Sequence, residues 1–259
     1  LTTRRQRQMC IRDRYNEVKM IDTLDEKIKA FEKLGIENLI IHPFDKNFSL
    51  LSADQFIKDY LIEKLKINHI IIGYDHRFGK GREASVDDLK KYGESFDFIV
   101  EEIKAHEVES IAVSSTKIRD SINSGNLDKS AKFLGRFFKI TGKVIKGDGL
   151  GKQINYPTAN LYVEENYKII PKDGVYFIKT LIDNKEFHGM MNIGHRPTIG
   201  ENKKSIEVHL FDFNKDIYDK TISVDVLLKI RDEIKFSSIE ALKEQLKKDE
   251  TYCNQLINK

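Results

Sequence analysis

The sequence predicts an α/β region with a parallel sheet, followed by a β region that forms an antiparallel sheet or closed barrel. Three observations lead to this fold class. Strand and helix signals alternate over residues 15–135, as they do in parallel sheets covered on both faces. Residues 136–236 instead hold several strand-like runs with short connections. The change falls near Gly135, and a capped helix follows the last strand.

Composition sets limits on the function. The 259 residues suffice for two modest domains, and 40% hydrophobic with 33% charged residues is typical of a globular protein. A net charge of +3 does not argue for nucleic acid or a membrane surface as partner, and no apolar run approaches the ~20 residues of a membrane span. Cys10 and Cys253 cannot form a disulfide framework or a zinc site, so a reduced, cytoplasmic protein is expected. The oligomeric state stays open.

Residues 1–14 are expected to be a non-native leader that takes no part in the fold. They read LTTRRQRQMCIRDR, with five arginines and no apolar period. A basic arm for nucleic acid is the alternative.

The first half contains helices with clear start signals. Thr23 and Glu26 form a capping box, and Gly35 ends that helix. Ser52 and Gln55 form a second box. Helices are expected at 23–35, 52–65, 86–92, 116–124 and 127–134, and strands at 38–41, 68–72 and 96–100.

The second half is dominated by strands. Runs of β-branched and aromatic residues with short connections favour an antiparallel sheet or closed barrel. Ser237 and Glu240 are then expected to cap a C-terminal helix. The strands are expected at 138–145, 174–181, 186–193, 205–213 and 221–230, with turns at 146–151, 183–185 and 214–220.

A glycine-rich loop follows the first of these strands. Gly147, Gly149 and Gly151 alternate, and Lys152 follows them. Alternate glycines bring backbone N–H groups close to an anion such as a phosphate. Taken alone, the loop could equally be a flexible hairpin turn. It is not a Walker A loop, because no Gly-Lys-Ser/Thr opens a helix.

Five further positions are candidates for binding and chemistry. Thr158 and Asn160 lie two residues apart on an extended segment and offer two neutral oxygen ligands for Mg²⁺, although a plain proline turn is the alternative. Glu207 lies on the face opposite an apolar stripe, where a solvated carboxylate is the alternative. Arg231 and Phe236 at the strand-to-helix corner could hold a flavin or phosphate, and the alternative is a surface charge cluster.

The order of these motifs resembles the riboflavin kinase domain of bacterial bifunctional riboflavin kinase/FMN adenylyltransferases, also called FAD synthetases. The resemblance covers roughly residues 136–250. It is carried by the blocks GKVIKGDGLGKQINYPTANL, PKDGVYFIKT, MNIGHRPTIG, IEVHLFDFNKDIYDKTISV and LLKIRDEIKFSSIEALKEQLKKD.

The resemblance implies a six-stranded antiparallel barrel that uses ATP and Mg²⁺ to convert riboflavin to FMN. The glycine-rich loop would cover the ATP phosphates. Thr158 and Asn160 would lie near Mg²⁺, and Glu207 would take the proton from the riboflavin 5′-hydroxyl. Arg231 and its neighbours would border the flavin. A non-catalytic flavin- or nucleotide-binding barrel is the alternative, although simple binding needs no base.

The first half resembles the FMN adenylyltransferase domain of the same family, which implies a Rossmann-like parallel sheet. The element GYDHRFGKG follows a strand, with His76 in place of the family's usual phenylalanine, and VSSTKIR matches a nucleotidyltransferase motif. Hydroxyls at a helix start with an arginine one turn later can bind phosphate, although Ser115 could instead cap the helix. The implied nucleotide-binding residues are Gly73, Asp75, Phe78, Ser115, Thr116 and Arg119.

The family opens with a Gly-x-Phe-Asp-Gly-x-His-x-Gly-His segment that has no counterpart here. All seven histidines are isolated from such a pattern. FAD synthesis by this polypeptide is therefore expected to be impaired. The expected division is a leader at 1–14, an incomplete FMN adenylyltransferase domain at 15–135 and a riboflavin kinase domain at 136–259.

Overall fold

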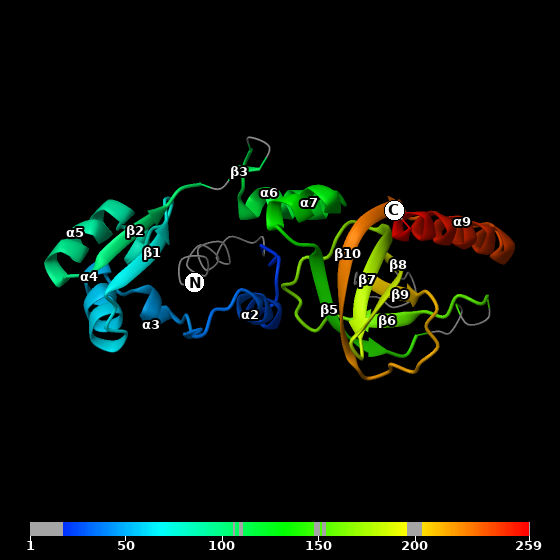
Figure 1. Ribbon diagram of the computed structural model, residues 1–259, viewed down its shortest axis with the longest axis horizontal. Helices are drawn as coiled ribbons and strands as arrows, with labels where there is room; N and C mark the ends of the chain where they lie inside the picture. The colour runs from blue at the N-terminus through cyan, green and yellow to red at the C-terminus, as the bar shows by residue number, and fades with distance from the viewer. Residues whose placement is uncertain are drawn as a thin grey trace. The chain divides into compact units, whose positions relative to one another are not determined.

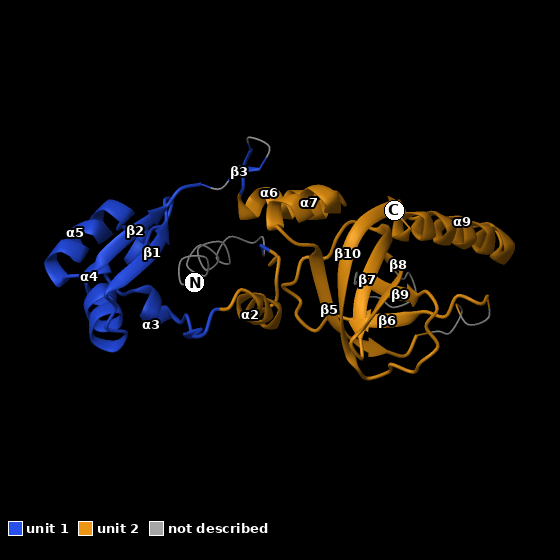
Figure 2. Cartoon of the chain, in the orientation of Figure 1, with its two compact units in different colours: residues 1–18, 36–113 blue, residues 19–35, 114–259 orange. Residues whose placement is uncertain are grey.

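The computed structural model describes residues 18–105, 107–108, 111–147, 151, 154–195 and 204–258. The predicted leader, and Gly149 and Lys152 of the glycine-rich loop, lie outside these residues. The chain divides into two compact units (Figure 2). Unit 1 comprises Leu1–Val18 and Ile36–Val113, and unit 2 comprises Lys19–Gly35 and Ser114–Lys259. The predicted division by activity near Gly135 stays a prediction.

Unit 1 is built on two parallel strands, as the strand–helix alternation predicts. β1 (His69–Gly73) pairs with β2 (Ile99–Ile103) over five residues each. Ser85 and Asp88 cap helix α5 (Val86–Phe96), which precedes β2. The remaining elements are α3 (Lys46–Ser49), α4 (Ala53–Gln55), the π-helix η1 (Phe56–Lys64), the 3-10 helix η2 (Lys80–Arg82), β3 (Glu107–Val108) and β4 (Ile111–Ala112).

Two expectations for unit 1 need correction. Residues 38–41 form no strand, and Ile40 and Ile41 are 60% and 50% exposed. No strand in the described part of unit 1 pairs with this run, and a short apolar run without a ladder partner gains too little to stay extended. The helix predicted at 52–65 exists and has its Ser52–Gln55 capping box, but residues 56–64 are wound as a π-helix.

The core of unit 2 is a closed six-stranded barrel with strand order β10-β5-β6-β9-β8-β7 (Figure 1). Every neighbouring pair is antiparallel, which confirms the predicted barrel. Alternate residues of β5 point inward, and Phe138, Ile140 and Val144 are fully buried. The strands are β5 (Phe138–Ile145), β6 (Ala159–Tyr162), β7 (Gly174–Ile182), β8 (Lys185–His195), β9 (Lys204–Leu210) and β10 (Thr221–Arg231).

Three helices that precede the barrel in sequence belong to its unit. They are α2 (Leu24–Lys33), with the predicted Thr23–Glu26 capping box, α6 (Ser115–Asn123) and α7 (Leu127–Leu134). Gly135 ends α7 in the left-handed region, at a φ of 68°.

Helix α2 and the segment before it are attached to the barrel part of the unit by two ion pairs. The buried Lys168 amine bonds Glu26 and lies 4.6 Å from the centre of the Phe138 ring. Arg136 donates to both carboxylate oxygens of Asp22, at 2.7 and 2.6 Å.

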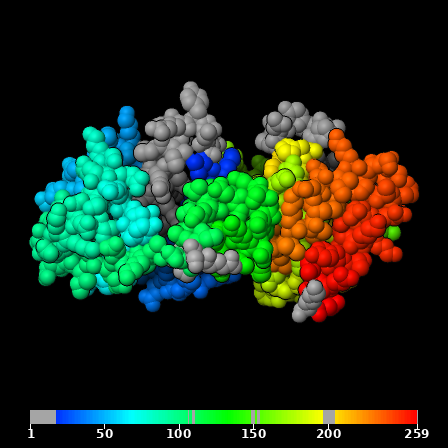
Figure 3. All heavy atoms as spheres, turned by 90° about the horizontal axis from the view of Figure 1, so that it is seen from above, coloured from blue at the N-terminus to red at the C-terminus, as the bar shows by residue number. Residues whose placement is uncertain are grey.

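A long helix, α9 (Ile239–Ile257), follows the barrel and packs against its outer surface. Its N-cap is Ser238 rather than the predicted Ser237, because the Ala241 N–H donates to the Ser238 hydroxyl. Cys253 is fully buried in a cluster with Val175, Phe177, Met190 and Phe211. Figure 3 shows α9 in red against the orange residues before it, as one continuous surface. No helix in the described ranges is long and apolar enough to cross a membrane.

Candidate active site

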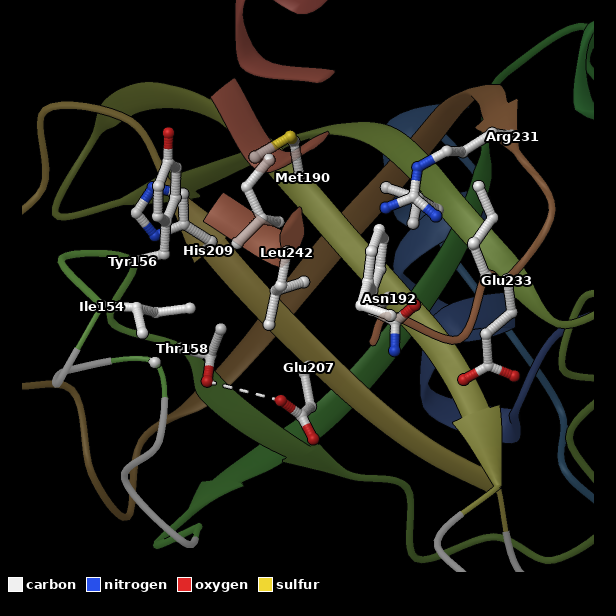
Figure 4. Close-up of a pocket in the computed structure, with 15 residues that line it drawn as sticks. Ile154, Tyr156, Thr158, Met190, Asn192, Glu207, His209, Arg231, Glu233 and Leu242 are labelled. Carbon is white, nitrogen blue, oxygen red and sulfur yellow. Dashed lines mark hydrogen bonds between the residues drawn. The ribbon is translucent and has the colours of Figure 1, made fainter. Parts of the chain in front are cut away.

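A pocket of about 250 Å³ lies on the outer face of the barrel, under the first turns of α9 (Figure 4). One end is polar and is formed by Thr158, Asn192 and Glu207. Six apolar side chains also line the pocket and are called here the apolar wall: Val175, Met190, Ile234, Phe236, Leu242 and Leu246.

Strand register brings the polar residues together. On β9, Ile206 and Val208 point into the barrel and are 5% and 1% exposed, so Glu207 points outward, as the alternation predicts. Glu207 lies opposite Asn160 on one neighbouring strand and opposite Asn192 on the other. The Thr158 hydroxyl donates to Glu207 Oε2 at 3.5 Å. Thr158 and Glu207 therefore meet at one end of one pocket, and Asn160 lies beside Glu207 on the neighbouring strand, outside the residues that line the pocket.

The described glycines of the loop allow close backbone approach to these residues. A Cβ on Gly147 would lie 1.9 Å from the side-chain nitrogen of Asn160. A Cβ on Gly151 would lie 2.2 Å from the carbonyl oxygen of Tyr156, whose N–H donates to Gly151 O at 2.8 Å. Glycine is thus required at position 151, where a side chain would meet backbone, whereas a side chain at position 147 would displace the amide of Asn160.

Arg231 and Phe236 also come together in the pocket. The Arg231 guanidinium carbon lies 5.8 Å from the centre of the Phe236 ring. Its Nε and one terminal nitrogen contact Asp249 Oδ2 on α9 at 2.9 and 2.8 Å. The other oxygen of Asp249 accepts from Gln245 at 2.8 Å. The helix thereby fixes the orientation of Arg231 at the edge of the apolar wall.

Several pocket residues escaped the sequence analysis. The Tyr156 hydroxyl donates to Glu250 Oε2 on α9 at 2.9 Å, and burial, with that bond, raises the pKa of Tyr156 to about 12. His209 lies edge-on to the Tyr156 ring at 5.1 Å, and its Nδ1 lies 2.8 Å from the Pro157 carbonyl, which requires a proton on Nδ1. In the sequence, Tyr156 stands two residues before the candidate ligand Thr158, and this position was the signal that could have identified it.

The nucleotide-binding residues predicted in the first half fall in both units. In unit 1, Gly73 ends β1, Asp75 is exposed, and Phe78 is 4% exposed within the hydrophobic core.

In unit 2, Ser115 and Thr116 open α6, and Arg119 Nε donates to the Lys19 carbonyl at 2.8 Å. The helix is capped by Ser114, not by Ser115. The combination of these residues with those of unit 1 in one nucleotide site stays a prediction.

The site offers oxygen ligands of mixed type. No cluster of three His, Cys, Asp or Glu side chains fit to hold a metal occurs within the described residues. The hydroxyl of Thr158, the amide of Asn160 and the carboxylate of Glu207 form the set that Mg²⁺ accepts when phosphate oxygens complete its shell.

Family models and curated relatives both match this chain. A family model described as riboflavin kinase matches residues 134–257, and one described as FAD synthetase matches residues 2–117. A bifunctional riboflavin kinase/FMN adenylyltransferase from Buchnera aphidicola of Schizaphis graminum is 41% identical over 238 residues, which cover 90% of this chain and 76% of the relative. The Escherichia coli K12 protein of the same name is 35% identical, over 88% of this chain and 72% of its own length.

A solved structure is similar over the same extent. A crystal structure described as a macrolide-efflux protein from Streptococcus pneumoniae superposes with a TM-score of 0.83 at 35% identity. The match covers 90% of this chain and 75% of that one.

Proposed function

The chain belongs to the family of bifunctional riboflavin kinase/FMN adenylyltransferases, and from this premise we propose that its barrel transfers the γ-phosphate of ATP to the 5′-hydroxyl of riboflavin. The observation that carries the proposal is the polar end of the pocket. There Glu207 lies 3.5 Å from the Thr158 hydroxyl and opposite Asn160, beside the described part of a glycine-rich loop.

The two ends of the pocket suit the two ends of riboflavin. The apolar wall, which includes Met190, Phe236 and Leu242, matches the flat apolar surface of an isoalloxazine ring. A ribityl chain that extends from the ring toward the polar end would bring its terminal hydroxyl to Glu207. Arg231, held beside Phe236, then borders the flavin.

Glu207 serves as the base that accepts the proton of the 5′-hydroxyl. A positioned carboxylate contributes about 10²–10⁴-fold to such a step. Its two neighbours across the sheet, Asn160 and Asn192, fix the strand position from which its side chain extends.

Thr158 and Asn160 would hold Mg²⁺ through a hydroxyl and an amide oxygen. When bound, Mg²⁺ neutralises phosphate charge, which phosphoryl transfer requires more than covalent help. The backbone at Gly147 and Gly151 lies against these ligand residues, which suits a loop that covers the ATP phosphates. Gly149 and Lys152 complete that loop in the sequence.

The FAD synthetase-like half is assigned the adenylyl transfer of the family, from ATP to FMN, and the impairment of this step expected from the sequence stays a prediction. The start of α6, with Ser115, Thr116 and Arg119, provides backbone N–H groups and a cation for phosphate. A nucleotide-binding role is also assigned to Gly73, Asp75 and Phe78 of unit 1, from the resemblance of their sequence element to that of the family. We assign both reactions to the cytoplasm, consistent with two cysteines that form no disulfide framework.

One incubation tests the proposal. The protein is mixed with riboflavin and Mg-ATP, and FMN and FAD are separated by chromatography. Time-dependent FMN that requires both ATP and Mg²⁺ is the expected result. Riboflavin that binds, as seen by quenched fluorescence, but is not converted would instead establish a binding barrel without turnover.

A further inference from the structure

Two adjacent carboxylates on α9 each bind a different residue of the pocket. Asp249 is 3% exposed and receives Arg231 Nε and a terminal nitrogen on one oxygen, while its other oxygen receives Gln245. Glu250 accepts the Tyr156 hydroxyl at 2.9 Å. Consecutive residues of a helix point in directions about 100° apart, so one helix turn reaches two places in the pocket.

The two contacts serve opposite sides of the pocket. Figure 4 shows Tyr156 beside His209 on one side and Arg231 on the other, with Met190 and Leu242 between them. Arg231 lies at the apolar wall, against Phe236.

Tyr156 belongs instead to the segment that carries the polar ligands. Its N–H bonds Gly151 O at 2.8 Å, and Thr158 follows two residues later. A displacement of Tyr156 would therefore move Gly151 and the Thr158 hydroxyl together.

The helix that presents these carboxylates is firmly attached to the barrel. Cys253 is fully buried in a cluster with Val175 and Met190, and Leu246 packs against the same cluster. Charge-assisted hydrogen bonds from such a rigid element can hold the long side chain of Arg231 in one orientation.

We propose that Asp249 and Glu250 are positioning residues that separately align the two substrates of the proposed kinase reaction. Asp249 orients Arg231 and so determines riboflavin binding. Glu250 orients Tyr156 and so determines the placement of Gly151 and Thr158, which are proposed to take Mg-ATP. The inference rests on the proposed function, since it assigns each carboxylate to one substrate of that reaction.

The test is a crossed pattern of Michaelis constants in the full chain. Asp249→Asn removes the charge that holds Arg231 and should raise the KM for riboflavin about 5- to 10-fold, with the KM for Mg-ATP within about twofold of wild type. Glu250→Ala releases Tyr156 and should give the reverse pattern, with a raised KM for Mg-ATP and a KM for riboflavin close to that of wild type. Glu250→Gln keeps an acceptor oxygen and should restore the KM for Mg-ATP. Glu244→Ala, an exposed site on the same helix, is the matched control.

Near-UV circular dichroism and the unfolding midpoint would reveal any variant that fails to fold. Two milder variants keep the test possible in that case. Tyr156→Phe removes the same hydrogen bond from its other partner and should reproduce Glu250→Ala. Gln245→Met frees one oxygen of Asp249 and should raise the KM for riboflavin by a smaller factor. Riboflavin fluorescence and Mg-ADP calorimetry should give the same split as dissociation constants.

The outcomes separate this inference from the proposed function. A folded wild type that makes no FMN refutes the proposed function and the inference with it. An active wild type whose folded variants show both constants rising together, or only a lower kcat, overturns the positioning roles and leaves the kinase assignment intact.

Discussion

At the scale of single residues, we expect turnover to depend most on the proposed base, Glu207. Glu207→Gln keeps the size of the side chain but removes its basicity. We expect the rate of FMN formation to fall about 10²–10⁴-fold, the weight of a positioned general base, while Mg-ATP binding by calorimetry stays near that of wild type. Glu244→Gln, on the exposed side of α9, is the matched control. A Glu207→Gln enzyme with near-normal rates would refute the base assignment.

Thr158 is expected to act on one substrate only. Thr158→Val is nearly isosteric and removes the hydroxyl that bonds Glu207 and is proposed to hold Mg²⁺. We predict a KM for Mg-ATP raised about tenfold, the loss of one hydrogen bond to a charged group, with riboflavin affinity by fluorescence little changed. Thr221→Val, an exposed change at the start of β10, is the comparison. Weaker riboflavin binding with normal ATP use would show that the hydroxyl serves the flavin instead.

Much of the polar end of the pocket could be predicted from the sequence, because strand alternation already directs Glu207 away from the barrel core. The short spacing of Thr158 and Asn160 likewise marks one extended segment. Asp249 and Glu250 could not be predicted. Nothing local in α9 indicates that its carboxylates bind Arg231 and Tyr156, which lie 18 and 94 residues earlier in the chain.

At the scale of elements, the attachment of the α2 segment to the barrel should contribute to stability. Glu26→Gln leaves the buried Lys168 amine without its counter-charge, and breaking a buried pair costs about 3–5 kcal/mol of unfolding free energy. Urea unfolding measures the loss.

The double change Glu26→Leu with Lys168→Met supplies the control, because two apolar residues of similar volume remove the unpaired charge. It should recover most of the stability. Asp219→Asn breaks the exposed pair with Lys143 and should change stability little. Equal, small effects for the buried and the exposed pair would show that the attachment is not stabilising.

Helix α9 contains a thiol that reports on its docking. Burial raises the pKa of Cys253 to about 12, so the thiolate that reacts with iodoacetamide is nearly absent from the folded protein at pH 8. In a Cys10→Ser background, we expect alkylation of Cys253 only on unfolding.

The same shift has a definite sign for stability. The pKa of Cys253 in the folded protein lies above its value of roughly 8.5 in the unfolded chain. The buried thiol therefore makes its full contribution to stability below about pH 8.5, and this contribution is lost as the pH rises toward 12. Cys253→Ala should remove this part of the pH dependence. Rapid labelling of the folded protein at pH 8 would contradict a docked helix.

At the scale of elements, strands were predicted correctly where an apolar run in the sequence also has a neighbouring strand to pair with in the fold. All five long barrel strands follow apolar runs that find a neighbour, whereas β6 has only four residues and gave no run of its own. Residues 38–41 show the converse, since their pattern is strand-like but no described strand of unit 1 pairs with them. Pairing is a property of the fold, and one segment's hydropathy does not contain it.

At the scale of the molecule, the barrel is expected to depend on residues outside the predicted kinase range. A fragment of residues 136–259 leaves Lys168 without Glu26 and Arg136 without Asp22. We predict a lower unfolding midpoint than that of the barrel in the full chain, by differential scanning calorimetry. Lys168→Met should raise the midpoint of the fragment, because it removes the uncompensated buried charge. A fragment as stable as the full chain would show that the boundary near Gly135 is also a folding boundary.

The position of α9 has a consequence for biosynthesis. Residues 249 and 250 follow the last barrel strand, which ends at Arg231, so a chain cut short between them keeps all six strands but leaves Arg231 and Tyr156 without the acceptors that hold them. A premature stop codon in α9 should therefore leave a barrel that recognises its vitamin poorly and yields little product.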